Sequence, residues 1–208
     1  MKFANHYLLA SILLVFFLGP IGFDCGLLSI MNLEILFLTI LIFSIFLHEH
    51  NSKLFKLTVI SLLIILINIL FFDINQSVFQ YFLKLFIISI AIIELFKEII
   101  RTKKIDFHII SSAISIYILI GIFWYLLFMF LLIIDPDAFY FRNLNKEHLS
   151  IDMIYFSFTT LTTLGYGDIT PVSYTAKMWS ITEAMMGVMF LAVMISRVVS
   201  LFGSKNKN

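Results

Sequence analysis

The sequence has little charge for its length. Of 208 residues only 13% are Asp, Glu, Lys or Arg, whereas 61% are hydrophobic, and the mean hydropathy is +1.04. A soluble domain has about a quarter of its residues charged, so this chain has too little polar surface to cover a soluble globule. The composition excludes a soluble enzyme and a disordered protein. The formal net charge of +1, with no long basic run, argues against nucleic-acid binding.

Cysteine, proline and glycine are also scarce. The single cysteine, Cys25, excludes an intramolecular disulfide and a cysteine-cluster metal site. Only three prolines and eight glycines interrupt the chain, so its secondary-structure elements should be long. Scarce charge and long apolar runs together predict an all-α membrane protein that crosses the lipid bilayer several times.

Six apolar runs are long enough to cross a bilayer, for which about 20 residues are needed. They cover about residues 7–23, 27–47, 54–72, 78–100, 107–134 and 175–202, and polar residues separate them. The first run follows Met1-Lys2 and therefore also has the form of a cleaved secretory signal. It lacks a small-x-small cleavage site, which favours a retained helix.

Basic residues are unequally divided between the two sides of these runs. If the amino terminus is cytoplasmic, the cytoplasmic side receives Lys2, Lys53, Lys56, Lys97, Arg101, Lys103, Lys104, Lys205 and Lys207, and the outer side only Arg142, Lys146 and Lys177. Because cytoplasmic loops are enriched in lysine and arginine, this predicts a multi-pass protein of the cell membrane with both termini in the cytoplasm. High usage of Ile, Phe, Asn and Lys is typical of an AT-rich bacterial genome and favours a bacterial inner membrane.

Residues 151–171, before the last run, are too few to span. About twelve of them can be helical before Gly165-Tyr166-Gly167. Irregular backbone at membrane depth is tolerated only where it is buried or lines a water-filled path. The two glycines permit backbone torsions that turn successive carbonyls the same way. Four such strands around one axis would form rings of carbonyl oxygens that replace the water around a dehydrated cation.

The segment from Thr160 to Asp168, TLTTLGYGD, resembles the signature of tetrameric potassium channels. Only Leu164, in place of the commoner valine, departs from it, and the resemblance extends over about residues 107–202. Together with the six apolar runs, it predicts six transmembrane helices plus a re-entrant pore helix and selectivity filter in each protomer of a homotetramer. It further implies a filter ending at Gly167, in which K+ binds the Thr163 hydroxyl and the backbone carbonyls of Thr163, Leu164, Gly165 and Tyr166.

Neighbouring residues are expected to support the filter. In relatives, an acid at the position of Asp168 bonds to an aromatic residue of the pore helix, and here Tyr155 or Asp152 is the candidate partner. Phe156 replaces an indole that is common at its position, which removes one hydrogen-bond donor. Thr162, within the signature itself, is a further candidate for filter support.

The last apolar run carries three further candidate features. Glu183 either bonds to Thr159 or Thr160 behind the filter or reaches the outer vestibule. Gly187 lies where many potassium channels have a hinge glycine, although glycine there also permits close helix packing. Helical spacing from this glycine puts three apolar residues on the central cavity, namely Val188, Leu191 and Ile195.

The first four runs resemble a voltage-sensor domain in position alone. Steep voltage gating needs several charges in the membrane field, yet nine uncharged residues separate Lys84 from Glu94 in the fourth run. We therefore predict that residues 1–104 form a four-helix, degenerate sensor-like domain and that residues 105–208 form the pore domain. The first four helices either surround the pore as a lipid-facing collar or bind a lipid, a small ligand or a partner subunit.

These observations predict a potassium-selective channel that is not strongly voltage-gated. It conducts K+ passively, is not an enzyme, and needs no cofactor besides the permeant ion. Two alternatives stay open: a nonselective cation channel, and a pore subunit that needs a partner chain. The intact TLGYGD argues against the first, because nonselective relatives usually alter the tyrosine or the second glycine.

Overall fold

The structure is a computed structural model that describes residues 2–24, 40, 42, 53–71, 78–102, 107–142 and 148–205. The predicted second span, residues 27–47, lies outside the described residues except for positions 40 and 42. Cys25, Lys103, Lys104 and Lys146 also lie outside them.

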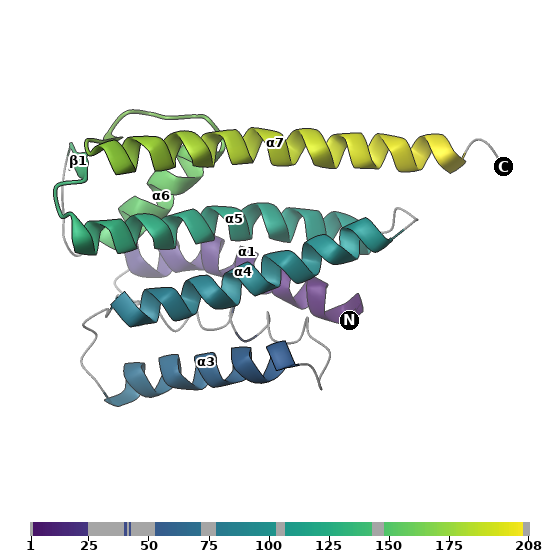
Figure 1. The fold of residues 1–208 in the computed structure, drawn as a ribbon, viewed down its shortest axis with the longest axis horizontal. Coiled ribbons are helices and arrows are strands. Elements are labelled where there is room, and N and C mark those ends of the chain that lie inside the picture. The colour runs from purple at the N-terminus through teal and green to yellow at the C-terminus, as the bar shows by residue number, and fades with distance from the viewer. Residues whose placement is uncertain are drawn as a thin grey trace. The chain divides into compact units, whose positions relative to one another are not determined.

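The described part is almost wholly helical (Figure 1). Its helices are α1 (Lys2–Asp24), α3 (Lys53–Phe71), α4 (Val78–Arg101), α5 (Phe107–Ile134), α6 (Leu149–Leu161) and α7 (Tyr174–Lys205), and its strands are β1 (Phe139–Phe141) and β2 (Ile169–Pro171). The helices are long because apolar residues continue for many turns and breakers are few: α3 and α4 contain neither proline nor glycine, and α5 and α7 contain no proline. The predicted runs agree with α1, α3, α4, α5 and α7 to within five residues at each end.

Three stretches of the described helices are long and apolar enough to cross a membrane. They are Val78–Arg101, Phe107–Ile134 and Tyr174–Arg197. The described side chains of α1 and α3 include the shorter apolar stretches His6–Leu18 and Lys56–Ile67. These helices indicate a membrane protein, and the count of six spans stays a prediction.

The chain divides into two compact units. The first is made of Met1–Thr102 and Asp106–Ile116, and the second of Lys103–Ile105 and Tyr117–Asn208. The division therefore falls inside α5, whereas the domain boundary predicted from the sequence lies between residues 104 and 105.

In the first unit, α3 packs against α4. The buried side of α4 follows the spacing of an apolar helical stripe and includes Tyr81, Lys84, Ile88, Ala91 and Leu95. Lys84 is only 6% exposed, and its Nζ lies 5.5 Å from the centroid of the Tyr81 ring. This cation–π contact offsets part of the free energy lost when the ammonium group leaves water.

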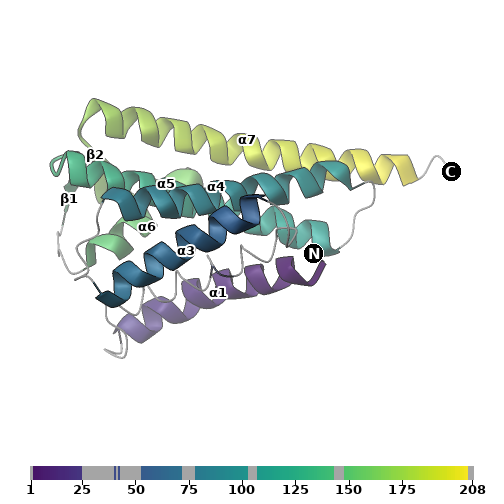
Figure 2. The same cartoon turned by 60° about the horizontal axis from the view of Figure 1, so that its bottom comes forward.

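In the second unit, two three-residue strands join the segment before α6 to the segment before α7 (Figure 2). They are antiparallel, with Phe139 opposite Pro171 and Phe141 opposite Ile169. The Ala138 carbonyl accepts hydrogen bonds from the amides of Val172 and Ser173, at 2.8 and 3.2 Å. Neither strand is evident in the sequence, because three residues are too few to show an alternating pattern.

Aromatic rings hold α6 against α5 and β1. The Phe156 ring meets the rings of Phe128 and Phe139 edge to face, with centroids 5.2 Å apart in both pairs. The Trp124 ring lies 5.9 Å from Phe128 on the same helix. Edge-to-face pairs contribute about 0.5–1.5 kcal/mol beyond the burial of their surface, so this cluster fixes the orientation of α6.

The substitution Phe128→Ala should destabilise the second unit. The Phe128 side chain has no exposed surface, and truncating a buried phenylalanine lowers the free energy of unfolding by about 3–5 kcal/mol. Thermal unfolding of the purified protein in detergent measures the effect as a lower midpoint. Ile133→Ala, on an exposed position of the same helix, is the control and should change the midpoint much less. Equal midpoints for Phe128→Ala and the parent would contradict the assigned core.

Candidate functional site

The backbone after α6 turns back on the end of that helix. The Leu164 and Gly165 amides both donate to the Thr159 carbonyl, at 2.8 and 3.1 Å, and the Thr163 amide donates to the Thr160 carbonyl at 2.9 Å. In a trans peptide the C=O points opposite to the N–H, and the described residues contain no cis peptide. The carbonyls of Thr163 and Leu164 therefore face away from α6.

Every second residue of this segment has a positive φ. Thr163, Gly165 and Gly167 have φ values of 60°, 53° and 80°. Because positive and negative φ values alternate, successive peptide planes turn so that neighbouring carbonyl groups point to the same side of the backbone. The left-handed conformation is ordinary for glycine but unusual for a β-branched residue. Sequence reasoning expected it at the two glycines and missed it at Thr163, where the hydrogen bonds back to α6 impose it.

One chain leaves this segment uncovered. The residues from Thr162 to Gly167 are all exposed, and the large side chains of Leu164 and Tyr166 are 56% and 67% exposed. Thr162 itself lies at the end of α6, where its Oγ1 donates to the Phe158 carbonyl at 2.7 Å. The segment that carries these carbonyls is thus exposed, and a single chain does not enclose a binding site around it.

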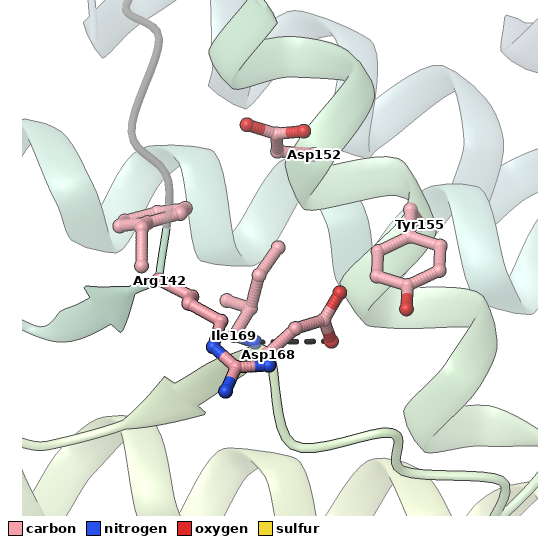
Figure 3. Close-up of a pocket in the computed structure, with 6 residues that line it drawn as sticks. Arg142, Asp152, Tyr155, Asp168 and Ile169 are labelled. Carbon is pink, nitrogen blue, oxygen red and sulfur yellow. Dashed lines mark hydrogen bonds between the residues drawn. The ribbon is translucent and has the colours of Figure 1, made fainter.

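Behind the segment, Tyr155 of α6 lies beside Tyr166, and its hydroxyl lies on the side of the Asp168 carboxylate (Figure 3). Its ring is stacked on that of Tyr166, with centroids 6.1 Å apart and planes 4° apart. Burial and a hydrogen bond to the Asp168 carboxylate raise the pKa of the Tyr155 hydroxyl to about 12. Asp168 Oδ1 also accepts a hydrogen bond of 3.1 Å from the Ile169 amide, so the carboxylate is held at the start of β2.

A cavity of about 210 Å³ lies beside these groups, lined by Phe141, Arg142, Asp152, Tyr155, Asp168 and Ile169. Burial raises the pKa of Asp152, His148 opposes this rise, and the negative charge of Asp168 adds to it. Of the two partners considered for Asp168, Tyr155 is the one that shares a hydrogen bond with it, whereas Asp152 only feels its negative charge. Among the described residues, no group of three or more metal-ligating side chains is placed to hold a metal ion.

Phe156 lies away from the filter, in the aromatic cluster with Phe128 and Phe139. Within one chain it therefore does not lie beside Tyr166, and the effect of the missing indole donor stays a prediction. The neighbouring residue Tyr155 lies there instead, because adjacent residues on a helix point about 100° apart.

Glu183 of α7 is fully buried against α6. Its Oε1 lies 2.5 Å from Ser157 Oγ, which also lies 2.8 Å from the Gly121 carbonyl oxygen of α5. The expected partners Thr159 and Thr160 were wrong, and so was an outer-vestibule position. Thr159 instead donates to the Phe156 carbonyl of its own helix, at 3.0 Å. Sequence reasoning missed Ser157, although a lone serine between two phenylalanines of an apolar helix was a signal.

Gly187 allows α7 to touch the end of α6. A Cβ atom at this position would overlap the Leu161 carbonyl oxygen, so only glycine permits this approach. Helix α7 is continuous through residue 187. The close-packing role is what the structure shows, and the hinge role stays a prediction. The three residues expected on the cavity, Val188, Leu191 and Ile195, are all exposed on α7.

The family described as "Ion channel" matches residues 128–204. This range contains the end of α5, α6, the carbonyl-bearing segment and almost all of α7. Residues 128–204 are an ion-channel domain. Such a domain moves ions and catalyses no covalent reaction, so the expectation of a non-enzymatic protein is confirmed.

Among curated proteins, the chain is similar to plant potassium channels. It is 41% identical over 56 residues to two-pore potassium channel 3 of Arabidopsis thaliana, which is 27% of this chain and 13% of that protein. It is 28% identical over 111 residues to two pore potassium channel a of Oryza sativa subsp. japonica, which is 53% of this chain and 29% of that protein. The chain thus spans less than a third of these relatives. No solved structure matches it.

The substitution Gly187→Val should separate α6 from α7. Adding bulk to a well-packed contact costs about 1–3 kcal/mol, and the new side chain would meet backbone, which has little room to move. We expect a lower thermal midpoint and a broader size-exclusion peak in detergent. Met185→Val introduces the same β-branched residue at an exposed position of the same helix, and it should behave like the parent. A Gly187→Val protein as stable as this control would disprove the close contact.

Proposed function

We propose that the chain is the protomer of a potassium-selective channel that conducts K+ passively across a membrane. The observation that carries this proposal is the backbone of residues 163–167, in which positive φ values alternate and the amides turn back to α6. The ion-channel domain and the potassium-channel relatives support it.

In this proposal, K+ loses its water to protein oxygens. The ligands are the carbonyls of Thr163, Leu164, Gly165 and Tyr166 with the Thr163 hydroxyl, and Gly167 ends the filter. A ring of carbonyl dipoles replaces the hydration shell of K+ better than that of Na+. The stacked ring and hydroxyl of Tyr155, together with Asp168, Thr162 and Glu183, hold the filter in place.

We further propose a homotetramer. A signature that occurs once in these 208 residues supplies one filter strand, and the exposed filter and the exposed apolar side of α7 support burial against further copies. The plant relatives are named two-pore channels, and a chain with two such strands would need fewer copies. Four copies would place Val188, Leu191 and Ile195 around a central cavity, with Gly187 as a candidate hinge.

The proposed setting is a bacterial inner membrane, with six spans in each protomer and both termini in the cytoplasm. The first four helices form a sensor-like domain without a repeat of basic residues. The buried Lys84, held beside Tyr81, is too little charge for steep voltage gating, because moving one charge across 100 mV supplies only about 2.3 kcal/mol. A lipid or a small ligand is the candidate modulator of these helices.

Cation flux from liposomes that contain only the purified protein tests the proposal. We expect K+ and Rb+ to leave much faster than Na+, and Ba²⁺ to block the flux. Gly165→Ala is the matched filter variant, because alanine resists the φ of 53° at this position, and it should conduct little or lose selectivity. Equal flux of all three ions would favour a nonselective cation channel. Silence of a confirmed tetramer would favour a subunit that needs a partner chain.

The substitution Tyr155→Phe keeps the ring but removes the hydroxyl that donates to Asp168. A hydrogen bond to a charged acceptor is worth about 1.5–3 kcal/mol. Its loss should therefore lower the equilibrium constant between the conducting and the non-conducting filter by about tenfold or more. We expect K+ current in planar bilayers to decay faster at constant voltage, with the preference for K+ over Na+ retained. Tyr140→Phe, which removes the hydroxyl of an exposed tyrosine on β1, is the control. An unchanged time course would exclude the support role.

A further inference from the structure

Glu183 is a charged residue type in an unusual place. Its side chain is fully buried, and glutamate is almost never fully buried without a partner. Oε1 contacts Ser157, whereas Oε2 is buried without a hydrogen-bond partner among the described residues. No lysine, arginine or histidine of the described part forms an ion pair with it. Tyr117 of α5 is a further ionisable group close enough to interact electrostatically.

The hydrogen bonds around Ser157 limit where protons can lie. The serine hydroxyl has one proton, and its Oγ lies within hydrogen-bond distance of two oxygens, the Gly121 carbonyl and Glu183 Oε1. A carbonyl oxygen can only accept. If the hydroxyl donates to Gly121, the proton of the contact with Glu183 must come from the carboxyl group. Both contacts are then satisfied, and Ser157 Oγ accepts from Glu183.

The opposite placement of the protons, with Glu183 ionised, is energetically less favourable. If Glu183 were ionised, the serine proton would go to the carboxylate, and Gly121 would lose its side-chain donor. Oε2 would then be a buried negative oxygen without a donor. A buried ion without compensating bonds is far more unfavourable than a buried neutral acid. The 2.5 Å separation lies at the short end of the range for O–H···O bonds.

We propose that Glu183 is a neutral carboxylic acid that donates its proton to Ser157, and that this bond makes it a positioning residue for the pore helix. The resulting chain of donors runs in one direction, from α7 through α6 to α5. This chain of hydrogen bonds requires a neutral hydrogen-bond donor at position 183, not a negative charge.

This bond and the Gly187 contact together attach the pore helix to α7. Glu183 and Gly187 lie one turn apart on α7, and they contact Ser157 and Leu161, which lie one turn apart on α6. A displacement of α7 at this level must therefore carry the end of α6 with it. Since the Thr159 and Thr160 carbonyls of α6 hold the filter amides, the displacement reaches the filter. This consequence, unlike the protonation itself, rests on the proposed pore function.

Infrared spectroscopy of the reconstituted protein tests the protonation without any need for conduction. A neutral carboxylic acid shows a C=O stretching band that an ionised carboxylate lacks. We expect such a band at neutral pH, lost in Glu183→Gln and retained in Asp152→Asn, which removes the acid beside the filter cavity. A spectrum of the parent without a band that Glu183→Gln removes would overturn the proposal.

Flux from liposomes tests the positioning role. Glutamine offers a neutral N–H donor to Ser157, so Glu183→Gln should retain K+ flux within about threefold of the parent, whereas Glu183→Leu and Ser157→Ala should lose about tenfold or more. Loss of flux in Glu183→Gln equal to that in Glu183→Leu would show that the negative charge is needed and would overturn the proposal. If the parent itself carries no K+ flux, the proposed function fails, and the infrared result still decides the protonation state.

Discussion

The Thr159 carbonyl oxygen accepts hydrogen bonds from two backbone amides beyond the end of its helix, and the geometry of residues 163–167 depends on this pair of bonds. With the amides of Leu164 and Gly165 turned inward, the carbonyls one residue earlier must turn outward. The bonds also draw Thr163 into a left-handed conformation that threonine otherwise avoids. The direction of the Thr163 and Leu164 carbonyls is therefore set by where α6 ends and how α6 is held.

Three sets of contacts hold α6, and each is of a different kind. An aromatic cluster around Phe156 fixes the side that faces α5 and β1. The buried Ser157 makes the polar contacts to α5 and α7, where an unsatisfied polar group is costly. The absence of a side chain at Gly187 brings the backbones of α6 and α7 together. Beyond the filter, the two short strands and Asp168 tie the chain to the segment before α6.

Much of the fold and part of the site could be predicted from sequence. The bounds of five helices follow from apolar runs and their polar ends, which are local properties. The signature TTLGYGD singled out the segment that turns back on α6, and the positive φ of Gly165 and Gly167 follows from glycine itself. The strands, Ser157, the left-handed Thr163 and the direction of Phe156 could not be predicted, because each depends on a contact between segments distant in sequence or on the end of a helix.

The sequence by itself thus determined the class of the protein as a helical membrane protein and the positions of its described long helices, and it singled out residues 163–167. The physical reason is that hydrophobicity, helix length and glycine torsions act within one segment. Only the tertiary structure decided the rotation of α6 about its axis. That rotation brings Ser157, and not Thr159, to Glu183, and these two residues are 26 positions apart. Packing against α5 and α7 sets it, and no local pattern in residues 149–161 encodes what those helices present.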